Sequence, residues 1–231
     1  MDKIAIKCEG VRKSYGADED KVQALRSTNL DINKNQLTLI VGPSGSGKTT
    51  LISIIATILT PDSGNLTILG EKMVGKTELE KSAFRCKNIG IVFQSFFLIP
   101  TLTIAENVAL PLIVSGVEEK VALEKAIALL DKIHLAHRAQ VSPKKLSKGQ
   151  QQKVAIVRAM INDAPIMVCD EPTSSLDHVS GEEVMKFLHE QSQNINKAVL
   201  VVTHDPRIFS YADRIISMSD GEIMSEEIKN G

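Results

Sequence analysis

The sequence predicts an α/β domain built on a mostly parallel sheet, with an antiparallel β part near its N-terminal end and a helical insertion at about residues 95–160. Three observations lead to this fold class. Short apolar runs of strand length alternate with helical patterns along the chain. The run at 37–41 leads through a glycine-rich turn into a helical pattern, which is the order of a phosphate-binding βα unit. From about 95 to 160, helical spacing predominates.

Length and composition fit this class. The 231 residues are 43% hydrophobic and 24% charged, enough to bury a sizeable core. The formal net charge of -1, from 27 basic and 28 acidic residues, argues against a strongly basic nucleic-acid-binding protein but leaves a local basic patch open. Three cysteines lie far apart without a CxxC pair, so we expect a reducing cytosol and neither a zinc site nor a disulfide framework.

The expected elements follow in order. Before the insertion these are a strand at 4–6, a loop at 14–20, a strand at 37–41, a helix at 49–59, a turn at 61–64, and strands at 66–69 and 89–94. After it come strands at 166–169 and 198–203, a helix near 182–191 between them, and a closing strand pair at 215–218 and 222–223. Within the insertion, one amphipathic helix is predicted from Leu123, Ala126, Ile127, Leu130 and Ile133.

No internal repeat or low-complexity linker divides the chain. We therefore expect one domain over 1–231, with a catalytic core at about 1–94 and 161–231 and a helical subdomain at about 95–160. A membrane-spanning helix needs about 20 apolar residues, and the runs at 51–59 and 108–114 are much shorter. Residues 1–9 mix charges with apolar residues, so no signal peptide is expected. Any membrane role is expected to come through a partner.

A phosphate-binding loop is the strongest motif in the sequence. Gly42-Pro43-Ser44-Gly45-Ser46-Gly47-Lys48-Thr49 fits the pattern GxxxxGK[ST]. Glycines let successive backbone N–H groups point at phosphate oxygens, and Lys48 adds a charge for the β- and γ-phosphates. The Thr49 hydroxyl can ligate Mg²⁺, and the helix that continues through Thr50 offers its positive end to the anion. An accidental glycine-rich turn is the alternative.

A second acidic motif ends the apolar run at 166–169. Asp170 can hold the Mg²⁺ shell, and Glu171 can orient or deprotonate an attacking water. Alone, the pair would be an ordinary acidic turn; beside the loop at 42–49, it predicts hydrolysis. A third motif is Leu146-Ser147-Lys148-Gly149-Gln150, where Ser147 suits the N-cap of a second exposed helix. Such an N-terminus can bind an anion, although a capped surface helix is the simpler explanation.

Together, these motifs resemble those of an ABC transporter nucleotide-binding domain, a P-loop NTPase with a RecA-like core. The resemblance covers nearly the whole chain and includes Gln94, the stretch 174–177 and Thr203-His204-Asp205. It implies that Tyr15 stacks on adenine, that Gln94 senses the γ-phosphate and Mg²⁺, and that His204 contacts the γ-phosphate. Taken singly, these three would read as a loop aromatic, a strand-end polar group and a helix-cap residue.

The resemblance also implies a homodimer. Cassettes of this family pair head to tail around two ATP molecules, so that Ser147, Gly149 and Gln150 of one copy bind the nucleotide held by the other, and Asp177 belongs to the loop that communicates across the dimer. Two positions depart from the family's pattern: Lys148 replaces a usual glycine, and Lys153 replaces a frequent arginine at a site expected to be exposed. We expect Lys148 to point to solvent.

Residues 92–103 and 106–112 are similar to the bacterial lipoprotein-release, macrolide-export and cell-division ATPases. This narrower resemblance implies an ATPase that drives a separate integral membrane permease from the cytoplasmic face of the inner membrane, by export or mechanotransmission. The alternatives are a transmembrane signalling complex and a soluble ABC ATPase acting on nucleic acid or ribosomes. The sequence disfavours the latter, because it has one cassette, near-zero net charge and no long coiled coil. Cargo identity is not encoded in any motif.

An apolar patch is predicted at residues 96–100. Three of the chain's six phenylalanines, Phe93, Phe96 and Phe97, lie within five positions of one another, directly around Gln94. A cassette that moves a permease needs an apolar surface to receive its partner's cytoplasmic helix. These side chains are expected to form that surface, with core packing as the alternative for each one.

Overall fold

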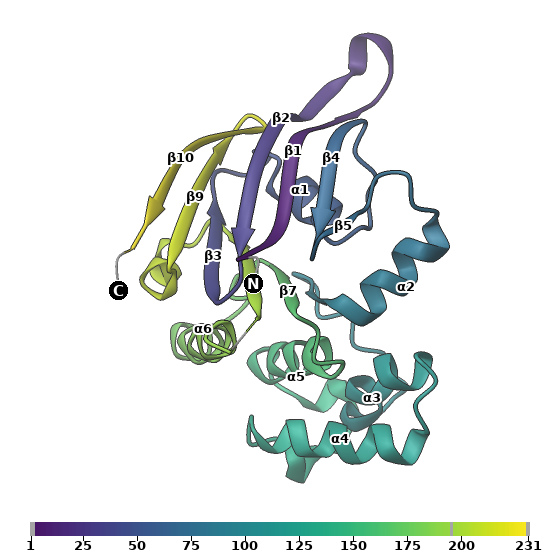
Figure 1. The fold of residues 1–231 in the computed structure, drawn as a ribbon. Helices are drawn as coiled ribbons and strands as arrows, with labels where there is room; N and C mark the ends of the chain where they lie inside the picture. Colours follow the sequence, from purple (N-terminus) through teal and green to yellow (C-terminus); the bar gives the residue numbers. More distant parts are fainter. Residues whose placement is uncertain (1–2, 195, 230–231) are drawn as a thin grey trace.

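The computed structural model describes residues 3–194 and 196–229 (Figure 1). Its strands are β1 (Ile4–Tyr15), β2 (Val22–Asn33), β3 (Gln36–Val41), β4 (Ser63–Ile68), β5 (Glu71–Lys72), β6 (Ile89–Val92), β7 (Ile166–Asp170), β8 (Ala198–Thr203), β9 (Arg214–Ser219) and β10 (Glu222–Ile228). Its α-helices are α1 (Lys48–Ile55), α2 (Glu78–Asn88), α3 (Ile104–Val114), α4 (Glu119–Asp131), α5 (Lys148–Met160) and α6 (His178–Ser192).

Within the described residues, the strands form two sheets. The larger has the order β10-β9-β3-β8-β7-β6, and all of its neighbouring strands are parallel except β9 and β10. The smaller is antiparallel, with the order β2-β1-β4-β5. Because β3, β7 and β8 run parallel, their carboxyl ends meet at one edge, where ligands bind in open α/β sheets. The predicted fold class is therefore confirmed.

The central strands are apolar throughout because both faces of the sheet are covered. One face packs against α1 and the antiparallel sheet, in a core that includes Ile40, Leu51 and Val202. The other packs against α6 in a second core that includes Leu39, Val184 and Val201. Parallel sheets covered on both faces give continuous apolar runs rather than alternation, which explains the strand signals in the sequence.

The helices α3, α4 and α5 share a third core and lie together in the lower half of Figure 1. Capping boxes begin two of them, at Thr103 with Glu106 and at Ser147 with Gln150. The segment before α3 is not helical. Buried Asn107 holds it by accepting from the Ile99 backbone N–H at 2.7 Å and donating to the Ile99 carbonyl at 3.0 Å.

Several expected elements differ from the structure. The helix predicted at 49–59 ends at Ile55, because the chain turns at Thr57 with a left-handed φ of 58°. Neither α2 nor β2 was predicted, and β1 is longer than the expected strand at 4–6. Ile127, placed on the apolar face of the predicted helix, is 38% exposed, so the buried stripe of α4 is narrower. Among the described helices, none is both long and apolar enough for a bilayer span.

Candidate nucleotide-binding site

A cavity of about 570 Å³ lies at the carboxyl ends of β3, β7 and β8. It brings together nearly all of the loop at 42–49 with residues that lie far along the chain. The lining residues are Ala24, Pro43, Ser44, Gly45, Ser46, Gly47, Lys48, Thr49, Thr50, Gln94, Asp170, Glu171 and His204. Of the predicted site residues, Tyr15, Gly42, Ser147, Gly149, Gln150 and Asp177 are not among them.

Backbone packing below the loop requires glycine at two of its positions. Gly47 has a φ of 94°, and a Cβ there would lie 2.3 Å from the carbonyl oxygen of Ala24. A Cβ at Gly42 would lie 2.1 Å from the carbonyl oxygen of Met218. The loop therefore rests on β2 and β9 at these two positions, where a side chain has no room. This contact also brings Ala24 into the cavity, a residue that sequence reasoning missed because an alanine within a strand carries no signal.

Lys48 is held against its own loop. It is buried, and its Nζ donates to the carbonyls of Gly42 at 2.8 Å and Pro43 at 2.7 Å. Burial lowers the pKa of the Lys48 ammonium, while the nearby carboxylates of Glu171 and Asp170 oppose that shift. The lysine thus places a fixed positive charge at the turn, where the amides of the loop can also bind an anion.

The two carboxylates follow β7 at the same edge of the cavity. Glu171 has a left-handed φ of 48°, fixed by its N–H donating to the Val202 carbonyl at 2.9 Å. This backbone turn aims its side chain at the cavity, where Oε1 lies 2.6 Å from Nδ1 of His204. Oε2 of Glu171 and Oδ1 of Asp170 are buried and have no hydrogen-bond partner among the described residues.

Burial raises the pKa of the Asp170 carboxyl, as does the charge of Glu171, whereas a hydrogen bond from Thr49 and the charge of Lys48 lower it. Two adjacent carboxylates with unused acceptor atoms need a cation or an ordered water. The oxygens of Thr49, Gln94 and Asp170 line one cavity and are of the hydroxyl, amide and carboxylate types that hard divalent cations prefer.

Tyr15 lies at the rim of this cavity rather than in its lining. It ends β1, is 44% exposed, and its hydroxyl lies 3.5 Å from Oγ1 of Thr50. An exposed aromatic ring at the edge of a phosphate site offers a flat apolar face for a base.

The motif at 146–150 lies outside this cavity. Ser147 caps α5, accepting from the Gln150 N–H at 3.3 Å, and Gln150 accepts from the Ser147 N–H at 3.1 Å. Gly149 is buried, and a Cβ there would lie 2.9 Å from Oγ of Ser180 at the start of α6. Asp177 caps α6 by accepting from Ser180. The structure thus joins these residues to one another but not to the loop of the same chain.

The two departures from the expected pattern behave differently. Lys148 is exposed, as predicted. Lys153 was expected at an exposed site, but it is half-buried and its Nζ lies 2.5 Å from Oε2 of Glu183 on α6. This ion pair links α5 to α6. A lysine can therefore serve here in place of the arginine expected from the family resemblance.

The cavity, its glycine loop and its paired carboxylates define a P-loop nucleoside triphosphatase. The model of the ABC transporter family matches residues 25–174. The chain is 40% identical to the lipoprotein-releasing system ATP-binding protein of Bacteroides thetaiotaomicron, over 96% of this chain and 100% of that one. The chain therefore belongs to the ABC transporter family, as an ATP-hydrolysing cassette.

Two further relatives extend this finding. The chain is 37% identical to the macrolide export ATP-binding/permease protein of Shigella flexneri, over 95% of this chain but only 34% of that one. It also matches the dimeric, ADP- and Pi-bound structure of an ATP-binding cassette from Methanocaldococcus jannaschii, with a TM-score of 0.91 and 39% identity over 98% of this chain and 99% of that one. The fold is thus that of a known dimeric cassette.

Proposed function

We propose that two copies of this chain pair head to tail around two ATP molecules and drive a separate integral membrane permease of the export or mechanotransmission type. The observation that carries the pairing is the position of α5. Its N-terminus is exposed, carries the residues expected to bind nucleotide, and is absent from the cavity of its own chain. A second copy is the partner that can use it, and the M. jannaschii relative forms a dimer.

The predicted site residues take separate roles in this proposal. Lys48 and the loop amides bind the β- and γ-phosphates, and Tyr15 stacks on adenine. Thr49, Gln94 and Asp170 would hold Mg²⁺, which supplies positive charge against the phosphates. Glu171 orients and deprotonates the attacking water, while His204 holds Glu171 and contacts the γ-phosphate. Ser147, Gly149 and Gln150 of the other copy close the site, and Asp177 lies beside them.

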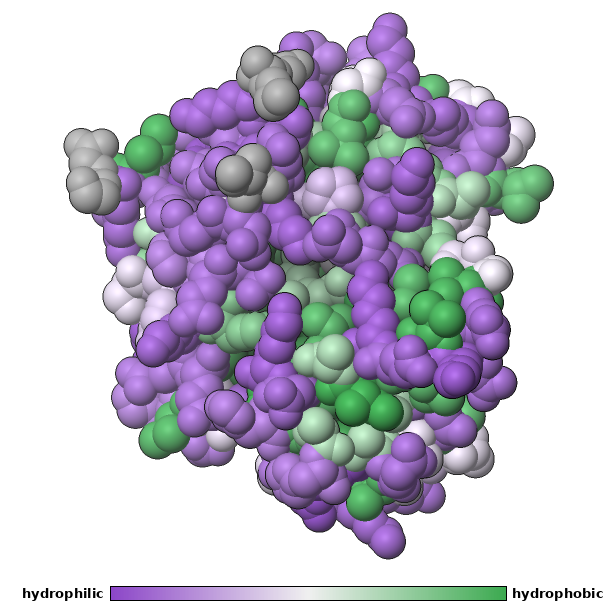
Figure 2. Space-filling model, turned by 60° about the horizontal axis from the view of Figure 1, so that its bottom comes forward, coloured by the Kyte–Doolittle hydropathy of each residue, from purple (hydrophilic) through white to green (hydrophobic). Residues whose placement is uncertain are grey.

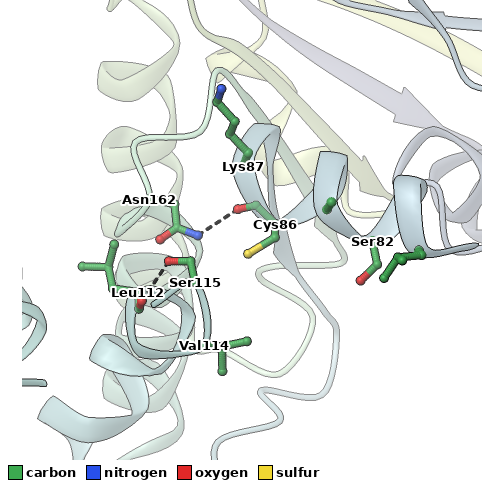
Figure 3. A pocket seen from close by; sticks show the side chains of 9 residues that line it. Ser82, Cys86, Lys87, Leu112, Val114, Ser115 and Asn162 are labelled. Carbon is green, nitrogen blue, oxygen red and sulfur yellow. Dashed lines mark hydrogen bonds between the residues drawn. The ribbon is translucent and has the colours of Figure 1, made fainter. Parts of the chain in front are cut away.

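The surface proposed for the permease is a groove between α2 and the end of α3. A cavity of about 530 Å³ there is lined by Ser82, Cys86, Lys87, Leu112, Val114, Ser115 and Asn162, labelled in Figure 3, together with Leu79 and Ala83. Leu79 and Val114 are 81% and 74% exposed. Figure 2, which turns the helical end forward, shows apolar side chains in green gathered among hydrophilic ones in purple. An apolar helix of a partner fits such a surface.

A second cavity of about 340 Å³ continues the groove toward β6 and shares Ser82, Cys86 and Asn162 with the first. The Asn162 amide donates to the Cys86 carbonyl at 2.8 Å, as drawn in Figure 3, while its oxygen is buried without a donor among the described residues.

The segment at 93–97 connects this surface to ATP. Gln94 lines the nucleotide cavity, and Phe93 beside it packs edge-to-face on Phe97 with ring centroids 5.2 Å apart. Arg158 of α5 donates to the carbonyls of Phe96 at 2.8 Å and Phe97 at 2.6 Å. Movement of Gln94 toward the γ-phosphate would therefore move both the exposed Phe97 ring and α5.

The apolar patch at 96–100 is only partly a surface. Phe97 is 64% and Ile99 38% exposed, but Leu98 is half-buried against the core of α3, α4 and α5. The expectation that Leu98 could serve as a surface residue is therefore wrong, since Leu98→Asp would place a charge in this core. Phe97→Asp is the better test.

Phe97→Asp should keep its circular dichroism and ATP affinity but lose binding to permease-containing membranes and permease-stimulated ATP hydrolysis. Glu190→Gln, on the exposed face of α6, is the control and should keep both. Full membrane binding and stimulation of the Phe97 variant would show that the permease does not depend on the Phe97 ring.

Residues 1–231 act as one unit, with about 95–160 as the helical part, bound peripherally to the cytoplasmic face of the inner membrane. The relatives' names support the transporter setting, because one of them joins an ATP-binding and a permease part in one chain. A transmembrane signalling complex is the second candidate. Whether the copurified permease transports a substrate distinguishes a signalling complex from a transporter.

A further inference from the structure

Exposed charges of opposite sign flank the two halves of the proposed ATP site. The acidic turn, defined here as Asp18 and Asp20, forms the 3-10 helix η1 (Asp18–Asp20) between β1 and β2. The lysine cluster, defined as Lys144, Lys145 and Lys148, lies on either side of Ser147 at the start of α5. All five of these side chains are exposed.

The described residues offer no ion-pair partner to either group. Several other charges are paired at short range, as in Lys197 with Asp163 at 2.7 Å. None of the ion pairs found among the described residues involves the acidic turn or the lysine cluster. Three lysines within five positions repel one another, and that repulsion falls when a negative surface approaches.

The acidic turn follows β1, which ends with Tyr15 at the rim of the nucleotide cavity of its own chain. It starts three residues after Tyr15, whose hydroxyl lies 3.5 Å from Oγ1 of Thr50 in α1. The lysine cluster, in contrast, surrounds the N-terminus of α5, which is absent from that cavity. In Figure 1 the turn between β1 and β2 stands at the top, while α5 lies in the lower half. Because the two are separated even in projection, they cannot pair within one chain.

We propose that the acidic turn of each copy faces the lysine cluster of the other copy, so that two such contacts flank the two ATP molecules of the dimer. This inference rests on the proposed head-to-tail pairing, which sets the N-terminus of α5 over the loop at 42–49 of the second copy. Groups that border these two features are then brought to the same rim. Two-fold symmetry makes the contact occur twice, with each surface used once in each copy.

Such a contact acts mainly on the association of two copies and on their relative orientation. Exposed opposite charges attract over about 8–10 Å at moderate salt, before any direct contact forms. They therefore steer two copies toward the head-to-tail arrangement and oppose the alternatives in which two lysine clusters or two acidic turns meet. Dimer formation by this chain should weaken as the salt concentration rises.

The test uses a Glu171→Gln background, in which ATP should be bound but not hydrolysed. The dimer dissociation constant is measured with ATP and Mg²⁺ by analytical ultracentrifugation, at low and high salt. The variants are Lys144→Glu with Lys145→Glu, Asp18→Lys with Asp20→Lys, and all four substitutions together. Lys120→Glu with Lys125→Glu, on the exposed side of α4, is the matched control.

Each double reversal should weaken the dimer by about tenfold or more at low salt and much less at high salt. The fourfold variant should return to within about threefold of its parent, and the α4 control should not differ from the parent. Circular dichroism of the ATP-free chains checks that each variant folds.

Three other outcomes are decisive in different ways. A parent chain that stays monomeric with ATP would overturn the proposed pairing, and this inference with it. If the parent dimerises but the lysine reversal alone weakens it, the lysines act on nucleotide phosphate and the acidic turn is not their partner. If both reversals weaken the dimer without rescue in the fourfold variant, the two groups do not face each other.

Discussion

Two helix N-termini of this chain can bind an anion, and they are built in opposite ways. The N-cap of α1 is Gly47, which offers no side-chain cap, so the first N–H groups of that helix face the cavity. The N-cap of α5 is Ser147, whose capping box with Gln150 satisfies the helix end internally. The first gathers its phosphate-binding groups within one chain. The second is capped while exposed, and in the proposed dimer it exchanges that cap for the ATP held by the other copy.

The two helix ends also differ in what surrounds them. Around α1, Asp170, Glu171 and Gln94 converge from other strands, and the loop rests on neighbouring backbone. Around α5, buried Gly149 rests on Ser180, and α6 has its own cap at Asp177. In the proposed dimer, the first site carries the chemistry and the second closes over the ATP held by the other copy. Substitutions at the two helix ends test this division.

Glu171→Gln should reduce ATP hydrolysis by at least about 100-fold, because the amide cannot accept a proton from water. ATP binding should persist, and the ATP-bound dimer should accumulate. Phosphate release and size-exclusion chromatography with light scattering measure the two effects. Glu190→Gln on α6 is the control, and hydrolysis by the Glu171 variant near the parental rate would remove this residue from the mechanism.

Lys48→Ala should weaken ATP binding by about 10- to 100-fold, since a charge-assisted hydrogen bond contributes about 1.5–3 kcal/mol. A fluorescent ATP analogue titrated against the monomer measures the affinity. Lys153→Ala, which breaks only the ion pair with Glu183, should leave that affinity unchanged. Equal affinity in the parent and the Lys48 variant would contradict the account of the loop.

Gly149→Ala should spare ATP binding by the monomer but weaken the dimer severalfold. The added Cβ meets Ser180, whose hydroxyl donates to Oδ2 of Asp177 at 2.8 Å, so the starts of α5 and α6 must shift together. A loss of about 1 kcal/mol of stability is expected from such overpacking. Thermal unfolding and sedimentation are the measurements, with Lys148→Ala at the exposed neighbour as control. Weakened ATP binding by the monomer would show that Gly149 contributes to the nucleotide site of its own chain.

Lys148→Gly should have the smallest effect, changing the rate of ATP hydrolysis by less than about threefold, or ~0.7 kcal/mol on the barrier. The side chain is exposed and strongly hydrated, and Lys144 and Lys145 also lie close to Ser147 in the sequence. Steady-state hydrolysis at saturating ATP measures it. A tenfold loss would mean that this lysine acts directly on the nucleotide of the other copy.

Sequence reasoning was most successful where a function is local in the chain. The loop at 42–49 is one contiguous motif and the acids at 170–171 are another. The structure brings the acids and nearly all of the loop into one cavity with Gln94 and His204. Ala24 was missed because it reaches the cavity through the packing of β2 under Gly47. The helix α2 was missed because it is largely polar, with only Lys81 and Phe84 buried. Leu98 was misjudged because its burial depends on α3–α5, which no local pattern reveals.

In the proposed dimer, the N-terminus of α5 completes the ATP site of a second copy. Crosslinking between two different variants detects this contact. One chain carries Ser44→Cys in the loop and the other Ser147→Cys, both with Glu171→Gln and Cys86→Ser. Cys8 and Cys169 are buried and need no change. The two chains are mixed with ATP and Mg²⁺ and treated with a short bifunctional thiol reagent. The account predicts an ATP-dependent crosslinked dimer in the mixture and none from either chain alone. Absence of a crosslink from the mixture, or equal crosslinking of the Ser44→Cys chain to itself, would contradict it.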